Sequence, residues 1–273
     1  MASACATMLP DVEQLAASLV GMSAGRPVGQ LSGHAAGSAM ERLVGRALDR
    51  RFPDRTFRQA DAMNQAMAAH PGQAFGAPAL NYLMTANRSR AAMQGWSPGN
   101  QFHEKQDDTA DFVVFSDAGK LFESAFVCLI DVKAENVAGS GFPGNKISAN
   151  KLVELARILL SSDSQLEFEI VYLFLRYQDD VETLGVAESN VVSLTKIPPE
   201  RTSINFTAGR QLQFPSTVAQ SFRGTGREWL QAFLWHFCGR LESRVAEQQG
   251  ELDRLRSLLS ASTEFDSEAA PSS

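Results

Sequence analysis

Short apolar runs that end in charged or turn residues constrain the fold of this chain more than any other feature of its sequence. FVVF follows Asp111, AFVCLI precedes Asp131, and FEIVYLFL fills residues 168–175. Apolar runs of about four to eight residues bounded by turn residues are typical of buried strands. The sequence therefore predicts a β-sheet whose strands are covered by other elements.

Helical patterns precede, separate and follow these strands. The predicted helices cover residues 33–51, 78–94 and 148–160 and the stretch from Gly226 onward, and further extended segments cover residues 191–194 and 204–214. Each predicted helix carries apolar residues at spacings of three and four. The order of helix, helix, strands, helix, strands and helix predicts an α/β or α+β fold, in which a mixed β-sheet is flanked by helices.

One domain is expected over residues 1–259, because no internal repeat and no Ser/Gly linker divides the chain. It would comprise a helical part over about residues 1–100, a core over about 101–215 and a C-terminal helix over about 225–259. Residues 260–273 are small and polar and are expected to form a disordered tail.

The C-terminal helix carries a stripe of apolar residues at spacings of mostly three and four, among them Leu241, Leu252, Leu255 and Leu259. Such a stripe serves either as a seam for a partner helix or as the face that packs on the core. Because Gly250 interrupts the stripe, we interpret it as core packing.

The triplet Asp131-Val132-Lys133 is the sharpest chemical feature, since it ends a buried strand. Side chains alternate along a strand, so Asp131 and Lys133 share one side. If the flanking strands pair about Leu121, Asp111 lies opposite Asp131. Two carboxylates beside a lysine can hold a hard divalent cation at a phosphodiester. A structural ion pair is the alternative, because an Asp-x-Lys triplet arises by chance about once in such a chain.

Cysteine usage and the N-terminus favour a cytoplasmic location. Cys5, Cys128 and Cys238 are odd in number and form no CxxC pair, which favours a reducing compartment. The N-terminus has no basic leading region, and no stretch of about 18 consecutive apolar residues exists to span a membrane.

Five motifs in this order carry a family resemblance: LSGHAAG (31–37), EKQDDTAD (104–111), DVK (131–133), NKISANKL (145–152) and INFTAGRQLQF (204–214). Together they resemble the HincII/HindII group of type II restriction endonucleases. The resemblance implies a PD-(D/E)xK nuclease fold, a homodimer, double-stranded DNA as substrate, and Mg²⁺ without an organic cofactor. It also implies cleavage at GTYRAC or a related palindrome to blunt ends with 5′ phosphates, within a restriction–modification system.

The same resemblance implies the catalytic roles. Asp111 and Asp131 are expected to bind the metal, and Lys133 to lie near the attacking water and the scissile phosphate. Glu41, just after the first motif, is expected to support the site. The separation of the two aspartates is longer than in the type member, which we interpret as an extended hairpin tip around residues 116–126.

The resemblance also implies DNA contacts for residues other than these catalytic ones. Asn145 is expected to contact bases in the major groove, and Phe142 to intercalate at a position where the type member has glutamine. The remaining expected DNA-binding residues are Gly141, Pro143 and Gly144 beside Phe142, Gln106 in the minor groove and Asn205 on the backbone.

The charge of −6 excludes a protein that binds DNA through a uniformly basic surface. Residues 136–160 nevertheless carry +2 and residues 201–240 carry +4, so the segments expected on DNA are locally positive. Two alternatives stay open: another PD-(D/E)xK nuclease that acts in repair or on junctions, and a catalytically inactive DNA-binding protein of this fold. The intact Asp111, Asp131 and Lys133 argue against the inactive protein.

Overall fold

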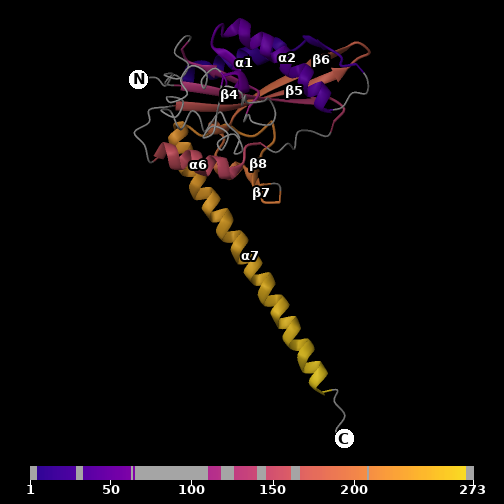
Figure 1. Cartoon of the computed structure of the whole chain (residues 1–273), viewed down its shortest axis with the longest axis vertical. Coiled ribbons are helices and arrows are strands. Elements are labelled where there is room, and N and C mark those ends of the chain that lie inside the picture. Colours follow the sequence, from indigo (N-terminus) through magenta and orange to yellow (C-terminus); the bar gives the residue numbers. More distant parts are fainter. Residues whose placement is uncertain are drawn as a thin grey trace. The chain divides into compact units, whose positions relative to one another are not determined.

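The computed structural model describes residues 5–28, 33–62, 64, 110–117, 126–139, 146–160, 167–207 and 209–268. The chain forms two compact units, residues 1–231 and 232–273. The first unit holds a β-sheet with its covering helices, and the second consists mainly of the later part of one long helix (Figure 1).

The main sheet of the described residues has six strands in the order β1-β6-β5-β4-β3-β2. They are β1 (Ser23–Gly25), β2 (Thr56–Arg58), β3 (Phe112–Phe115), β4 (Phe126–Asn136), β5 (Glu167–Asp179) and β6 (Thr183–Ser193). β4 and β5 are parallel, and the other neighbours are antiparallel. The helix α6 (Ala149–Leu160) lies between β4 and β5 in the chain and supplies the crossover that a parallel pair requires. The predicted mixed sheet flanked by helices is confirmed.

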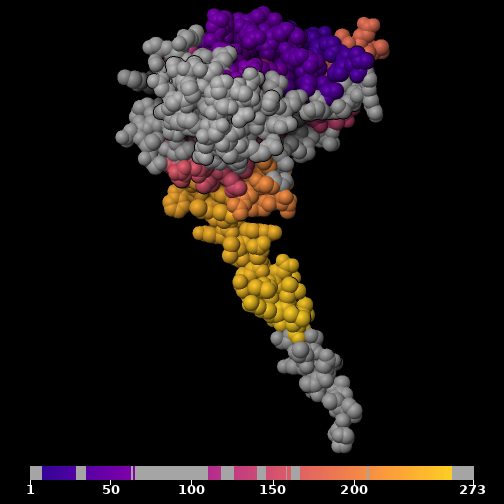
Figure 2. All heavy atoms as spheres, in the orientation of Figure 1, coloured from indigo at the N-terminus to yellow at the C-terminus, as the bar shows by residue number. Residues whose placement is uncertain are grey.

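One face of the sheet packs under two N-terminal helices, α1 (Cys5–Leu19) and α2 (Gly33–Arg51) (Figure 1). Their atoms, coloured indigo and purple, gather at the top of the view in Figure 2. Their apolar sides join alternate residues of β4, including Cys128, Ile130 and Val132, in one buried cluster. The intervening residues of β4 point to the other face, because side chains alternate along a strand. Val132 therefore faces the core, and Asp131 and Lys133 lie together on the opposite side, as the sequence predicts.

A small antiparallel sheet of β7 (Ser203–Asn205) and β8 (Gln211–Gln213) adjoins the chain that enters α6. The Lys146 N–H donates to the Leu212 carbonyl at 2.9 Å, and the Leu212 N–H donates to the Ile147 carbonyl at 3.0 Å. These bonds fix the backbone of residues 146–147 beside β8. The helix expected at residues 78–94 lies outside the described residues.

The long helix α7 (Gly226–Glu268) begins with a capping box at Thr225 and Glu228. The Glu228 carboxylate accepts from the Thr225 N–H at 2.7 Å, and the Thr225 hydroxyl accepts from the Glu228 N–H at 3.2 Å. Each side chain thus satisfies a backbone donor that the first turn leaves without a helical partner. In the same turn the Trp229 indole donates to the Ile197 carbonyl at 2.7 Å, so the start of α7 is anchored in the first unit.

Two features of α7 differ from the expectation. The helix continues to Glu268, so residues 260–268, expected in a disordered tail, are helical. The core-packing interpretation of its apolar stripe is wrong for the later part, because Leu252, Leu255 and Leu259 are 42%, 51% and 67% exposed. Neither α7 nor any other described helix is apolar over enough of its length to cross a membrane.

Candidate active site

Asp111 and Asp131 meet where β3 begins beside β4. The register pairs Phe112 with Ile130, which sets Asp111 opposite Asp131 and confirms the hairpin pairing that the sequence predicts. The Asp111 N–H donates to the Ile130 carbonyl at 3.1 Å. In return, the Asp111 carboxylate accepts a hydrogen bond from the Val132 N–H at 2.7 Å. The Asp111 side chain is thereby fixed against the middle of the triplet.

Lys133 completes this group. Its Nζ lies 2.8 Å from Oδ1 of Asp131, and the two side chains are 31% and 14% exposed. The ammonium is therefore held at the partly open edge of a carboxylate that is itself mostly buried. From this position Lys133 can reach an anionic substrate without leaving Asp131.

The two carboxylates are poorly solvated. Burial, followed by the charges of Asp131 and Glu41, raises the pKa of Asp111 to about 8. The hydrogen bond from Val132 and the charge of Lys133 act in the opposite direction. Burial also raises the pKa of Asp131, although Lys133 lowers it through its charge and its hydrogen bond. Burial therefore disfavours the charged forms of both carboxylates in the metal-free site, and a bound cation would favour them.

These carboxylates fit a hard divalent cation. Two carboxylate groups face each other across an antiparallel strand pair, and a Mg²⁺ ion commonly takes one or two carboxylates and keeps several waters. A bound cation would offset the electrostatic repulsion between the two carboxylates. Within the described ranges no group of three or more His, Cys, Asp and Glu side chains forms a complete metal cage.

Glu41 reaches the site from α2. Its charge raises the pKa values of both Asp111 and Asp131, which places it within electrostatic range of the pair. Arg58 of β2 lies 3.5 Å from the Glu41 carboxylate and 4.3 Å from the centre of the Phe112 ring. Arg58 thus links Glu41 to the residue that follows Asp111, a connection that sequence reasoning missed.

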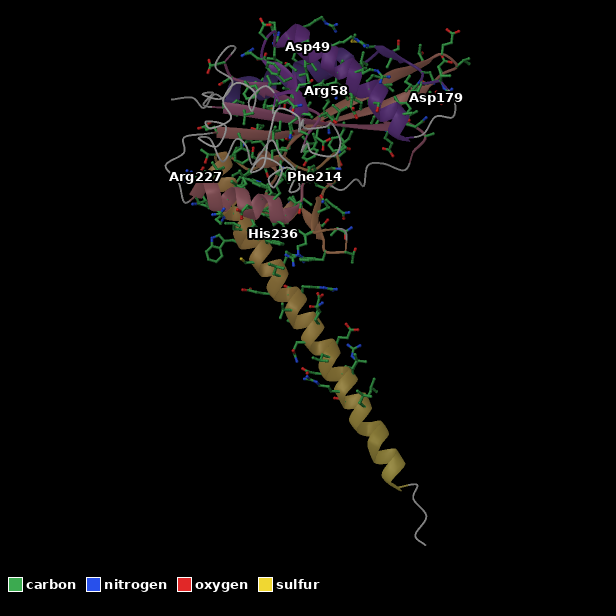
Figure 3. All side chains as sticks on the ribbon, viewed as in Figure 1. Asp49, Arg58, Asp179, Phe214, Arg227 and His236 are labelled. Atoms are coloured by element: carbon green, nitrogen blue, oxygen red, sulfur yellow. The ribbon has the colours of Figure 1, made fainter. Side chains whose placement is uncertain are left out.

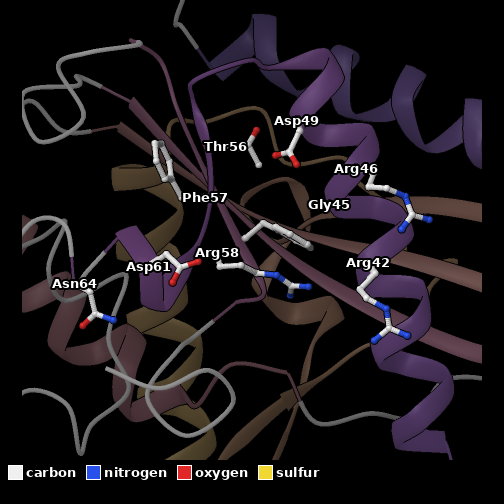
Figure 4. Close-up of a pocket in the computed structure, with 10 residues that line it drawn as sticks. Arg42, Gly45, Arg46, Asp49, Thr56, Phe57, Arg58, Asp61 and Asn64 are labelled. Atoms are coloured by element: carbon white, nitrogen blue, oxygen red, sulfur yellow. The ribbon is translucent and has the colours of Figure 1, made fainter. Parts of the chain in front are cut away.

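A pocket of about 630 Å³ opens between α2 and β2 (Figure 4). Arg42 and Arg46 of α2 and Arg58 of β2 line it, together with Asp49 and Asp61. Because Arg58 also pairs with Glu41, the pocket adjoins the candidate site through that ion pair. The three guanidinium groups exceed the two carboxylates, so the lining has a positive balance.

Lys146 is a second lysine near the site, and sequence reasoning missed it. Its Nζ lies 5.9, 5.1 and 5.5 Å from the ring centres of Tyr172, Phe174 and Phe214. Phe214, labelled in Figure 3, follows β8, whereas the other two rings belong to β5.

The charge of Lys146 acts on Asp131 and lowers its pKa. Burial and the charge of Lys133 lower the pKa of Lys146 itself to about 8. No local signal in the sequence could have found this residue, because its environment is assembled from β5 and the chain after β8.

Asn205 lies at the end of β7. Its side-chain oxygen accepts hydrogen bonds from the Thr207 N–H at 3.1 Å and from the Thr207 hydroxyl at 2.7 Å. This arrangement is an Asx turn, which shapes the connection from β7 to β8. The contact with the DNA backbone expected for Asn205 stays a prediction.

The other residues expected to contact DNA lie outside the described residues, and their roles also stay predictions. They are Gln106, Gly141, Phe142, Pro143, Gly144 and Asn145.

Comparisons with known proteins agree with the resemblance of the motifs. The family model described as Restriction endonuclease HincII matches residues 15–252. The type II restriction enzymes HindII and HincII of Haemophilus influenzae are each 33% identical to the chain over 246 residues, covering 86% of this chain and 92% of the relative. Among solved structures, one titled NlaIV restriction endonuclease matches 80% of this chain and 71% of its own, with 12% identity and a TM-score of 0.36.

Proposed function

The chain belongs to the HincII restriction endonuclease family, and on that basis we propose that it is a Mg²⁺-dependent type II site-specific deoxyribonuclease. It acts as a homodimer on double-stranded DNA in the cytoplasm, as the nuclease of a restriction–modification system. Its target is a short palindrome, GTYRAC or a related sequence, which it cuts to blunt ends with 5′ phosphates.

One observation carries the proposal: Asp111 lies opposite Asp131 at the start of β3, with Lys133 2.8 Å from Asp131 on the same side of β4. A structural ion pair would need only Asp131 and Lys133. A second carboxylate, mostly buried near the first and hydrogen-bonded to Val132 of β4, adds electrostatic repulsion that a purely structural ion pair does not need.

In this mechanism Asp111 and Asp131 would hold the Mg²⁺ ion. When bound, the ion would supply positive charge at the scissile phosphate and make the attacking water more acidic. Lys133 is positioned to hold that water or a phosphate oxygen for in-line attack on phosphorus. The water loses a proton to solvent as its oxygen bonds to phosphorus, the bond to the 3′ oxygen breaks, and that oxygen takes up a proton from solvent to become a hydroxyl. The phosphate stays on the 5′ end. Glu41, paired with Arg58, places a third carboxylate near the two aspartates.

Specificity in the proposed enzyme comes from two symmetric half-sites, each read by one protomer. Asn145 contacts base edges, and Phe142 inserts between base pairs, with Gly141, Pro143 and Gly144 allowing close approach of the backbone. Gln106 reaches the minor groove and Asn205 the DNA backbone. Because the cost of unstacking depends on sequence, the phenylalanine at position 142 alters the preferred target.

Digestion of a sequenced plasmid, followed by mapping of the ends, tests the proposal. With Mg²⁺ the purified chain should give discrete fragments with 5′ phosphates at one short palindrome, and a chelator should abolish cutting. A smear without discrete ends would contradict site specificity. Binding to plasmid without any cleavage would favour the inactive DNA-binding alternative.

A further inference from the structure

Helix α7 carries a heptad pattern in the second unit. Leu241, Val245, Gln248, Leu252, Leu255 and Leu259 follow one another at alternating spacings of four and three residues. These are the a and d positions of a coiled coil, in which two helices pack along one narrow apolar seam. Gly250 falls at an f position, on the side away from the seam, so it does not interrupt the pattern.

The seam is open in the single chain. Val245, Leu252, Leu255 and Leu259 are 64%, 42%, 51% and 67% exposed. Scattered exposed leucines are ordinary on a protein surface, but a row of them along one side of a helix marks an interaction surface. The HincII family model ends at residue 252, so the last part of the seam lies beyond the matched residues.

The residues in and beside the seam favour a second copy of this chain as the partner. Glu251 is at a g position and Arg256 at the following e position, and in a parallel dimer the g residue of one helix faces that e residue of the other. Two copies in register therefore form two opposite-charge pairs across the seam. Gln248, at a d position, meets Gln248 of the other copy, where its amide can hydrogen-bond to its own kind and fix the register.

We propose that residues 238–259 of α7 form a parallel, in-register two-stranded coiled coil with the same residues of a second copy of this chain. The contact lies wholly within α7 and requires no DNA, no metal and no catalytic residue. The inference rests on the homodimer of the proposed function and adds the place on α7 where two copies meet; cleavage and the α7 contact can fail separately.

Cys238 provides a direct test, because it occupies the a position before Leu241 and its thiol is exposed. Cysteines form a disulfide only when their Cα atoms come within about 7 Å, which a parallel in-register pair brings about at this position. Mild oxidation of the full chain with copper–phenanthroline should therefore give a covalent dimer on a non-reducing gel, and Cys238→Ser should abolish it. A monomer band alone, or a dimer band that survives Cys238→Ser, would overturn the proposal.

Seam variants distinguish this contact from random collision. Leu252→Asp should reduce Cys238 cross-linking at least about tenfold, because it buries a charge in the seam. Ala246→Asp introduces the same charge at an exposed b position and should leave the yield unchanged. Equal yields for the two variants would refute a specific seam. Cleavage of plasmid by Leu252→Asp reports separately on the nuclease site.

Exchanging the charges at positions 251 and 256 tests whether the partner is a second copy of this chain and whether the two helices are parallel. Glu251→Lys and Arg256→Glu each place like charges across the seam and should lower the yield of Cys238 cross-linking about threefold or more. The double variant exchanges the charges and should restore the cross-linking yield to within about twofold of the original chain. A double variant as weak as the singles would rule out the parallel pairing.

Discussion

The carboxylate of Asp111 accepts a 2.7 Å hydrogen bond from the backbone N–H of Val132. The bond joins the start of β3 to the one residue of the triplet that faces the core, while Asp131 and Lys133 point the other way. A backbone N–H that donates to a carboxylate favours its charged form, and the charged form is the one that binds a cation. The pairing of β3 with β4 therefore fixes the position of the Asp111 side chain.

Lys133→Ala should abolish cleavage while leaving DNA binding intact. In the proposed mechanism the ammonium beside Asp131 acts on the reacting phosphate, so we expect a loss of at least about 10³-fold in single-turnover cleavage. Affinity for a target duplex, measured with Ca²⁺ in place of Mg²⁺, should change less than about threefold. Lys196→Ala is the control on another segment, and equal losses for both variants would contradict a catalytic role for Lys133.

Asp111→Asn should stabilise the metal-free protein at high pH. The pKa of Asp111 is raised to about 8 in the folded chain, from 3.8. The stability associated with its neutral form is complete below about pH 4 and is lost as the pH rises through about 8. Asparagine stays neutral, so the variant's advantage in Tm should grow between pH 4.5 and pH 9, to about 3 °C or more.

The measurement is thermal unfolding in EDTA across this pH range. Asp117→Asn, at an exposed position after β3, is the matched control and should show no growing advantage. A Tm difference for Asp111→Asn that is the same at both ends of the range would argue against the buried carboxyl.

Lys146→Met should shift the pH dependence of cleavage. The charge of Lys146 lowers the pKa of Asp131, so its removal leaves Asp131 protonated at a higher pH. Cleavage by the variant, relative to the original chain, should be lowest at the acid end of the pH profile and should recover as the pH rises. Lys146→Arg keeps the cation and should retain the original profile. A loss of equal size at every pH would show that Lys146 acts in some other way.

Two glycines of α2 should respond in opposite directions to alanine. A Cβ on Gly45 would lie 3.0 Å from the ring of Phe112, and the Arg58 guanidinium lies 4.3 Å from the centre of the same ring. The ring is confined, so Gly45→Ala should cost about 1–3 kcal/mol of unfolding free energy in urea. At Gly37 a Cβ would meet nothing nearer than Glu41 at 4.0 Å, and alanine should add about 0.5–1 kcal/mol. Equal effects at both positions would contradict the close packing at Phe112.

The pairing of Asp111 with Asp131 could be predicted because both residues belong to one hairpin, where register follows from sequence separation. The environment of Lys146 could not be, since its rings come from Tyr172 and Phe174 on β5 and from Phe214. Such contacts arise only when distant segments pack together, and no local periodicity reports them.

The elements β1, β2 and α1 could not be predicted from the sequence, because none of them has a clear local pattern. β1 and β2 have three residues each, too few for an alternating pattern to stand out. The helix α1 contains Pro10, which is disfavoured inside helices. The role of the stripe on α7 could not be predicted, because spacings of three and four describe a face packed on its own core and a face packed on another helix equally well.

β4 runs without interruption from Phe126 to Asn136, paired along its length with β5 and at its start with β3. Backbone in the middle of such a ladder opens only when much of the domain unfolds. Asp131 and Lys133 are therefore preorganised before any substrate arrives. In the proposed enzyme we therefore expect the choice between the right DNA sequence and a wrong one to depend on access of the scissile phosphate to this site, and not on assembly of the site itself.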